Sequence, residues 1–116
     1  MRFPELYRLL ALRGAEVLAV PAALTLQTGK DYWELLLRAR VVEIQAFVLS
    51  PAQWGQKADG RWTHGRSMIV GPWGTLFAQC PDWDGHARAT LDLDYLDRFR
   101  GEVPALDNRR PQAYEW

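Results

Sequence analysis

Two short apolar runs, Val17–Val20 and Ala46–Leu49, each follow a segment with helical periodicity, and this alternation constrains the fold more than any other feature. Both runs are apolar at every position, which is typical of strands covered on both faces. Pro21 ends the first run and Ser50-Pro51 ends the second. Repetition of helix, short turn and buried strand predicts an α/β fold built in layers.

The two segments that precede these runs have distinct helix signals. The first helix is expected over Pro4–Arg13, because proline suits the first helical position and Gly14 can end the helix. The second is expected over Lys30–Ile44, with Thr28 as the N-terminal cap of a capping-box sequence. This second helix has two apolar faces, which predicts two neighbours, one of which can be another subunit.

The remainder of the chain is expected to contain shorter elements. The pattern predicts a long loop or loose hairpin at 53–65, strands at 67–70 and 75–78 joined by a tight turn, a strand at 86–93, and a helix at 94–100 capped by Asp94. We therefore expect one domain over residues 1–100. Residues 101–116, which end in Tyr114-Glu-Trp116, are expected to form an irregular tail.

Composition and charge exclude several functional classes. The 116 residues carry 14 basic and 14 acidic side chains, so no basic field predicts binding to nucleic acid. No run approaches the ~20 apolar residues that span a bilayer, and Pro4, Glu5 and Arg8 interrupt any signal-like segment. The single cysteine, Cys80, fits a reducing compartment. A cytoplasmic protein that does not bind membranes is the expectation.

Four stretches together carry a resemblance to a known family. They are Arg2–Arg8, then Val20–Thr25 with Thr28, Gly29 and Trp33, then Leu37–Arg40 with Glu43, Gln45 and Pro51–Gln53, and finally Gly65–Gly74. In order and spacing they resemble the C-terminal half of a domain of the nitrilase (carbon–nitrogen hydrolase) superfamily. The resemblance implies one β-sheet with helices on one face, which is half of an α-β-β-α sandwich.

The resemblance also implies which functional residues are present. The family hydrolyses nitriles, amides or N-carbamoyl compounds with a glutamate, a lysine and a cysteine, all upstream of the position that matches Arg2. The expectation is therefore a chain without catalytic residues. Leu24, where the family has an aromatic residue, and Thr25 are the implied substrate-pocket candidates. Tyr32, Ile44, Arg66 and Gly71 also depart from the family pattern.

Other chemistry has little support in the sequence. Cys80 is followed by Asp82 and Asp84, which disfavour a thiolate, so a buried structural cysteine is expected. His64, Cys80 and His86 do not have the spacing of a zinc site, and neither a metal nor a cofactor is expected. The loop tryptophans, Trp54, Trp62 and Trp83, are expected to anchor loops or a subunit contact, the alternative being a platform for a sugar, base or aromatic ligand.

A half-sandwich leaves one sheet face without a cover, which predicts self-association into a homo-oligomer. The candidate interface residues are Leu6, Leu9, Leu10, Trp33, Leu37, Arg40 and Val41. Three functions stay open: a non-catalytic half-domain that assembles or binds, a hydrolase half that needs a separate N-terminal half, and an enzyme with new chemistry between identical subunits. The first is preferred, and no hydrolase activity is expected from the chain by itself.

Overall fold

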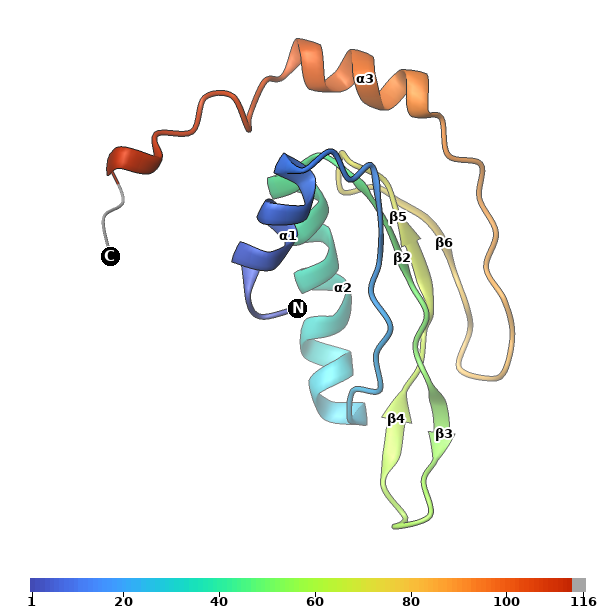
Figure 1. The fold of residues 1–116 in the computed structure, drawn as a ribbon. Helices are drawn as coiled ribbons and strands as arrows, with labels where there is room; N and C mark the ends of the chain where they lie inside the picture. The colour runs from blue at the N-terminus through green and yellow to red at the C-terminus, as the bar shows by residue number, and fades with distance from the viewer. Residues whose placement is uncertain (114–116) are drawn as a thin grey trace.

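The computed structural model describes residues 1–113, which form a small mixed β-sheet with helices packed around it (Figure 1). The helices are α1 (Pro4–Leu12), α2 (Leu26–Ile44), α3 (Leu93–Glu102) and the 3₁₀ turn η1 (Pro111–Ala113). The strands are β1 (Val17–Ala19), β2 (Phe47–Ser50), β3 (Trp54–Gln56), β4 (Trp62–His64), β5 (Met68–Val70) and β6 (Leu76–Gln79). This arrangement confirms the predicted α/β class.

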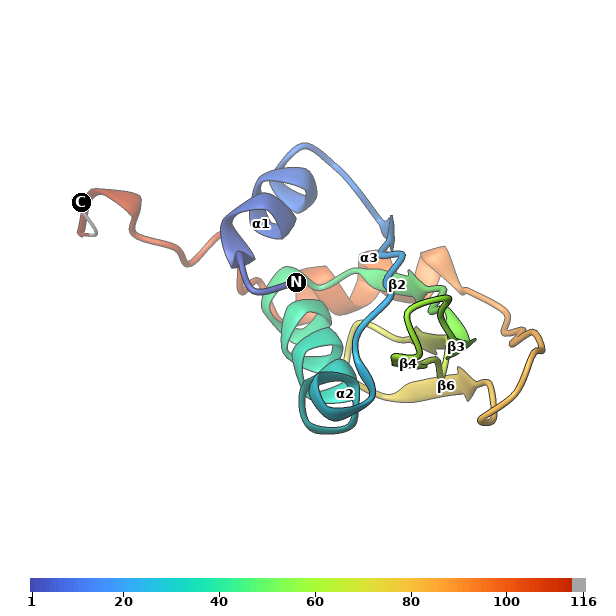
Figure 2. The same ribbon diagram turned by 90° about the horizontal axis from the view of Figure 1, so that it is seen from below.

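Four strands form the main sheet in the order β1-β2-β5-β6, and β3 and β4 form a separate hairpin. Strands β1 and β2 are parallel, whereas β2, β5 and β6 are antiparallel to their neighbours. Leu18 lies opposite Val48, which in turn lies opposite Val70, so these three side chains share one face. Helices α1 and α2 lie side by side on that face (Figure 2).

The core lies between this face and α2. Trp33, Leu37, Val41 and Ile44 are spaced so that one stripe of α2 meets the sheet, and each is at most 1% exposed. On the sheet side they meet apolar residues of β1, β2 and β5, namely Leu18, Val48, Met68 and Val70. Burying each large apolar side chain contributes roughly 1.5–3 kcal/mol. This stripe therefore fixes α2 on the sheet.

Helix α3 closes one end of the opposite face of the sheet, which we call the outer face. Leu96 and Phe99 are its buried residues, and the Phe99 ring meets the Trp73 ring edge-on at 4.9 Å between centroids. Arg100 donates hydrogen bonds to the carbonyl oxygens of Gln45 (2.8 Å) and Ala15 (3.0 Å). These bonds attach α3 to the end of α2 and to the turn that precedes β1.

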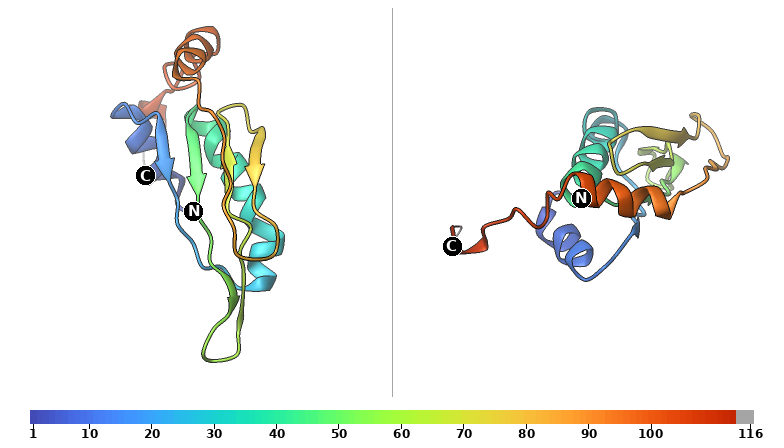
Figure 3. Two further views of the ribbon diagram at one scale, coloured as in Figure 1. Left: turned by 90° about the vertical axis from the view of Figure 1, so that its right-hand side faces the viewer. Right: turned by 90° about the horizontal axis from the view of Figure 1, so that it is seen from above.

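Below α3, one extended segment crosses the outer face between β6 and α3 (Figure 3). Gly85, His86 and Ala87 of this segment line a shallow hollow with Leu49 and Ile69 of the sheet. Beyond α3, the chain runs away from the sheet and past α1 (Figure 2). None of the helices among residues 1–113 has the length and apolarity needed to span a bilayer.

Three details of the predicted elements are wrong. Helix α2 begins at Leu26 with Thr25 as its cap, because the Thr25 hydroxyl, and not that of Thr28, accepts a hydrogen bond from a first-turn N–H group. Helix α3 begins at Leu93, one residue before the predicted start, and its cap is Asp92 instead of Asp94. The expected strand at 86–93 is absent, because this segment crosses the face of the sheet instead of pairing with an edge.

The C-terminal region is partly regular. Helix α3 continues to Glu102, two residues beyond the predicted end, and η1 follows after a turn. The predicted boundary between a domain at 1–100 and a tail at 101–116 stays a prediction. The terminal Tyr114-Glu-Trp116 lies outside the described residues.

Candidate functional site

The C-terminal ends of the parallel strands β1 and β2 lie side by side and continue as paired extended segments. The amide of Val20 donates to the carbonyl of Leu49 (2.8 Å), and that of Ala22 donates to the carbonyl of Pro51 (3.0 Å). The Ser67 hydroxyl fixes the second segment by accepting a hydrogen bond from the amide of Ala52 (2.8 Å). In open α/β sheets, ligands bind outside the carboxyl ends of the strands. This end of the sheet is therefore the first candidate site.

A hollow of about 490 Å³ opens between these two segments. We call it the strand-end hollow, and its lining is Pro21, Ala22, Ala23, Pro51, Ala52, Gln53 and Ser67. None of these side chains is ionisable. The hollow can thus shape a binding surface and offer hydroxyl, amide and backbone hydrogen bonds, but its lining cannot supply a general base or a charged nucleophile.

The two predicted pocket residues, Leu24 and Thr25, lie in the connection from this hollow to α2. Leu24 is half-buried against the core, and its carbonyl accepts a hydrogen bond from the amide of His64 (3.0 Å). Thr25 caps α2 and forms an isolated bridge with Thr63 of β4. Neither side chain is part of the lining of the hollow. Their role at a substrate pocket stays a prediction.

The β3–β4 hairpin extends beyond the main sheet next to this connection (Figure 1). The Trp54 and Trp62 rings pack against each other with their centroids 5.5 Å apart. Gly65, at φ +69°, ends the hairpin, and a Cβ at this position would lie 2.8 Å from the Cβ of Trp54. Glycine is therefore required here both by the backbone conformation and by the close packing of Trp54.

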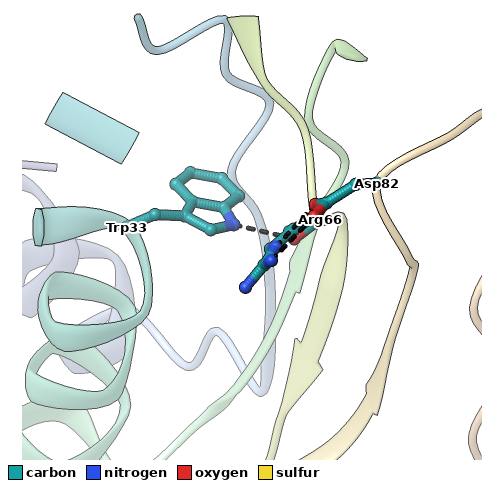
Figure 4. A network of polar contacts seen from close by, with 3 residues as sticks. All are labelled: Trp33, Arg66 and Asp82. Carbon is teal, nitrogen blue, oxygen red and sulfur yellow. Dashed lines mark hydrogen bonds and ion pairs between the residues drawn. The ribbon is translucent and has the colours of Figure 1, made fainter. Parts of the chain in front are cut away.

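A polar network joins three segments that are far apart in the sequence (Figure 4). The indole Nε1 of Trp33, on α2, donates to the carbonyl of Arg66 (2.8 Å), which lies between β4 and β5. The Arg66 guanidinium donates to both carboxylate oxygens of Asp82, from Nε at 2.7 Å and from Nη2 at 2.8 Å. Arg66 has φ +59°, which directs its side chain toward the segment after β6.

Charge and burial set the protonation of these groups. The hydrogen bonds from Arg66 hold the pKa of Asp82 below its ordinary value, and the same bonds raise the pKa of Arg66. Nearby His64 is buried, and burial together with the positive charge of Arg66 lowers the pKa of its imidazole. At neutral pH, this region therefore contains a neutral imidazole beside an intact ion pair.

The predicted interface residues divide into two groups. Trp33, Leu37 and Val41 are at most 1% exposed in the core, and Arg40, at 7%, donates a hydrogen bond to the carbonyl of Met1. Leu10 is partly buried against the same core. Leu6 and Leu9 of α1 are 58% and 44% exposed. Of these candidates, it is therefore mainly Leu6 and Leu9 whose side chains are exposed to a partner.

Cys80 and the two histidines are not gathered into one cluster among residues 1–113. Cys80, which directly follows β6, is 5% exposed. Its amide donates a hydrogen bond to the carbonyl of Ser67, which precedes β5. Within residues 1–113, no three side chains of the metal-binding types are close enough to hold a metal ion. Lys57 lies in the exposed hairpin loop, and Lys30 lies in the first turns of α2.

Residues 1–101 match the family model for carbon-nitrogen hydrolases, and the chain therefore belongs to the carbon–nitrogen hydrolase family. It is 46% identical to human deaminated glutathione amidase, over 98% of this chain and 35% of that protein. It is 47% identical to the deaminated glutathione amidase of Synechocystis, over 94% of this chain and 40% of that protein. The chain thus spans little more than a third of the length of these relatives.

The structural comparison agrees with the sequence. The crystal structure of the Caenorhabditis elegans NitFhit protein matches 98% of this chain with a TM-score of 0.94 and 43% identity, although the match covers only 28% of that chain. The resemblance predicted from the four sequence stretches is confirmed, and the fold is a part of the nitrilase fold.

Sequence reasoning missed the grouping of His64, Arg66 and Asp82. Arg66 is recognisable as a departure from the family pattern, and Asp82 follows a strand, but nothing in the sequence pairs the two. The pairing depends on the left-handed backbone at Arg66 and on the path of the chain after β6. A hydrophobic pattern contains no information on either feature.

Proposed function

We propose that this chain forms the C-terminal half of an amide-hydrolysing domain and is inactive until its sheet is covered by a half that carries the glutamate, lysine and cysteine of the family. The similarity to deaminated glutathione amidases supports an amide as the substrate. In this proposal, the chain contributes the strand-end hollow and the connection that includes Leu24 and Thr25. The covering half contributes nucleophilic attack, general base catalysis and stabilisation of the tetrahedral intermediate.

The observation that carries the proposal is the apolar outer face of the sheet. Val17 and Ala19 of β1 alternate with buried Leu18, and Val17 is 37% exposed. Ile69 is only half-buried, and Phe77 of β6 is 42% exposed although its ring packs edge-on against Phe47. A β-sheet with apolar residues on both faces is typical of a middle layer, which needs a cover on each side.

The molecule is less compact than a closed domain of its length. The chain measures 47 × 37 × 20 Å, with a radius of gyration of 15.5 Å, whereas a compact domain of this length has about 13 Å. Its accessible surface is 7760 Å², whereas a compact monomer of its mass exposes roughly 6,450 Å². The excess includes the surface of the segment after α3, which runs away from the sheet (Figure 2), as well as that of the open outer face.

The lining of the strand-end hollow explains why the chain alone is expected to be inactive. Its only polar side chains are those of Gln53 and Ser67, and the Ser67 hydroxyl also donates to the carbonyl of Ala52 (3.3 Å). Serine without an adjacent base is a weak nucleophile, and neither residue can take up a proton near pH 7. What the chain can do at the hollow is shape one wall, exclude water and orient a substrate.

Reconstitution tests the proposal. The chain would be mixed with the separately produced N-terminal part of human deaminated glutathione amidase. Appearance of a free primary amine from deaminated glutathione would be followed, because hydrolysis of its amide bond yields a carboxylic acid and an amine. We expect turnover from the mixture and none from either part alone. A version of the human part with its nucleophilic cysteine replaced by alanine is the matched control. A stable complex without turnover, or turnover by the chain alone, would contradict the proposal.

A second candidate is a non-catalytic homo-oligomer in which a copy of the chain covers the outer face. The exposed apolar residues of that face, among them Val17 and Phe77, favour it, and Leu6 and Leu9 on α1 offer a second contact surface on the other side of the sheet. Sedimentation velocity of the chain alone tests this candidate, and a single monomeric species would exclude it. New chemistry between identical subunits is the third hypothesis, and hydrolysis by the chain alone that is lost in Cys80→Ala would support it.

A further inference from the structure

A second, smaller pocket of about 230 Å³ lies on the helix side of the sheet, between the first turns of α2, the β3–β4 hairpin and the ends of β5 and β6. It shares no lining residue with the strand-end hollow. We call it the His64 pocket. Its walls combine apolar side chains with charged groups, a combination typical of sites for small amphipathic ligands.

His64 is the buried polar group of this pocket. The residue is 8% exposed. Its side chain packs so closely against Gly29 that a Cβ added to Gly29 would lie 2.1 Å from the His64 Cβ. Neither ring nitrogen has a hydrogen-bond partner among residues 1–113, although the ring lines the pocket. A neutral imidazole has one N–H donor and one acceptor nitrogen. Because neither nitrogen is bonded within the described residues, a ligand in the pocket can form a hydrogen bond with the ring.

The charges of the pocket leave one cation unpaired. Arg66 is neutralised by Asp82 through two hydrogen bonds, and Glu34 pairs with Arg38 at 3.3 Å. Lys30 lines the pocket and has no ion pair within the described part of the chain. The N-terminal end of the 19-residue helix α2 adds partial positive charge on the same side. The lining contains two cations and two carboxylates, so Lys30 and the helix end can together balance no more than a single negative charge.

The apolar walls indicate the rest of the ligand. Leu26, Trp54 and Met68 line the same pocket and contribute apolar surface, including one aromatic ring. A water molecule takes about 30 Å³, so the pocket holds roughly eight waters or a ligand of about ten non-hydrogen atoms. A dianion is disfavoured because the carboxylates of Glu34 and Asp82 also line the walls.

We propose that the His64 pocket binds a small monocarboxylate with an apolar or aromatic body. The carboxylate accepts hydrogen bonds from the Lys30 ammonium and the His64 N–H, and the apolar body lies against Trp54 and Leu26. This site does not depend on the proposed hydrolase function, because none of its residues belongs to the strand-end hollow.

Phenylacetate, with ten non-hydrogen atoms, is the probe for the test. The chain contains only two histidines, so the Cε1–H proton signals of His64 and exposed His86 can be followed together by NMR. We expect saturable movement of the His64 signal without movement of the His86 signal. Phenylacetamide, which has the same shape but no charge, should bind about tenfold more weakly, the loss expected for one charge-assisted contact.

The two lysines of the chain provide a matched pair of variants. Lys30→Ala should weaken phenylacetate binding about tenfold, whereas Lys57→Ala, in the hairpin loop, should leave binding unchanged. Both side chains lie on the surface, so neither change removes core packing. An unmoved His64 signal at millimolar phenylacetate, or equal affinity in Lys30→Ala, would overturn the proposal. Because only binding is measured, failure of the hydrolase proposal would not affect the result.

Discussion

At the scale of single residues, His64 makes stability depend on pH. Burial and the charge of Arg66 lower its pKa from the ordinary 6.5, so the unfolded chain binds this proton more readily than the folded chain. The contribution of neutral His64 to stability is therefore complete above pH 6.5. It decreases as the pH falls toward and through the lowered pKa that His64 has in the folded chain. We expect the free energy of unfolding to fall below pH 6.5, and this slope to be shallower in His64→Gln. Urea titrations between pH 5 and 7.5 measure how the free energy of unfolding depends on pH. Equal slopes in the unmodified chain and in His64→Gln would contradict the account.

The Arg66–Asp82 pair gives a second prediction at this scale. The pKa of Asp82 is lowered chiefly by hydrogen bonds from Arg66, so Arg66→Gln should raise it toward the ordinary 3.8. The contribution of the pair to stability is present above pH 3.8 and is lost as pH falls through the lower folded pKa. A ¹³C carboxyl titration of Asp82 measures the shift. Arg61→Gln, at the other exposed aspartate–arginine pair, is the control and should leave Asp82 unchanged.

Residue roles were predictable only where the family pattern or local geometry marked them. Trp33 was predicted as an interface candidate but is buried in the core, because helical spacing places it on the stripe of α2 that meets the sheet. The partner of Arg66 was not predictable, since Asp82 lies 16 residues away and beyond a complete strand. Thr28 was expected to cap α2, but it lies one turn after the actual cap, Thr25. The sequence contains threonine at both positions, and only the backbone of Thr25 has an extended conformation.

At the scale of elements, contact between α2 and the β3–β4 hairpin depends on Gly29. A side chain there would overlap the Cβ, Cγ and Cδ2 atoms of His64. We expect Gly29→Ala to lower the free energy of unfolding by about 1–3 kcal/mol, the usual cost of overpacking. Gly101→Ala in α3 is the matched control, because nothing lies within 4 Å of a Cβ at that position. It should be neutral or stabilising by up to about 1 kcal/mol; equal destabilisation of both variants in chemical denaturation would contradict the account.

Attachment of α3 depends on Arg100, which bonds two carbonyl oxygens in other segments. Arg100→Met should lower the opening free energy of α3 by about 3 kcal/mol, because two charge-assisted hydrogen bonds of about 1.5 kcal/mol each are lost. Hydrogen exchange of the α3 amides measures this change. Arg98→Met on the exposed side of the same helix should leave the exchange unchanged. Equal protection in the two variants would show that Leu96 and Phe99 alone hold the helix.

The elements that were predicted correctly have strong local patterns. The apolar runs at 17–20 and 46–49 appear as strands β1 and β2, although only β2 is largely buried, since Val17 and Ala19 of β1 are exposed. Gly14 follows the first helix with φ +91°. The segment at 86–93 shows the limit of such patterns. It alternates as a strand does, but pairing requires a free sheet edge beside it, and this depends on the path of the chain after β6.

At the scale of the whole molecule, the thin shape and the apolar outer face both reflect a sheet that is well covered on one face and largely open on the other. One face of the sheet is buried under α1 and α2 (Figure 2). Within residues 1–113, the other face is covered only by α3 and a single extended segment (Figure 3). Family resemblance predicted the half-sandwich, and the match to carbon–nitrogen hydrolases supports the same interpretation. The hydrophobic pattern of residues 1–113 does not specify what covers the outer face.

The two candidate partner surfaces can be separated by one pair of substitutions. Ala19→Arg places a charge on the outer face, and Leu9→Arg places one on the exposed side of α1. Both side chains lie at the surface of the chain, so both variants are expected to fold, as near-native circular dichroism would show. A buried unpaired charge at an interface is strongly destabilising. The variant that prevents assembly therefore identifies the surface that is covered.

The most direct test of the central claim is the turnover of deaminated glutathione by the reconstituted mixture, measured for these two variants beside the unmodified chain. If a triad-bearing half covers the outer face, Ala19→Arg should abolish turnover and Leu9→Arg should retain most of it. Full turnover in Ala19→Arg, together with loss in Leu9→Arg, would show that α1 and not the sheet meets the catalytic half, and would contradict the account.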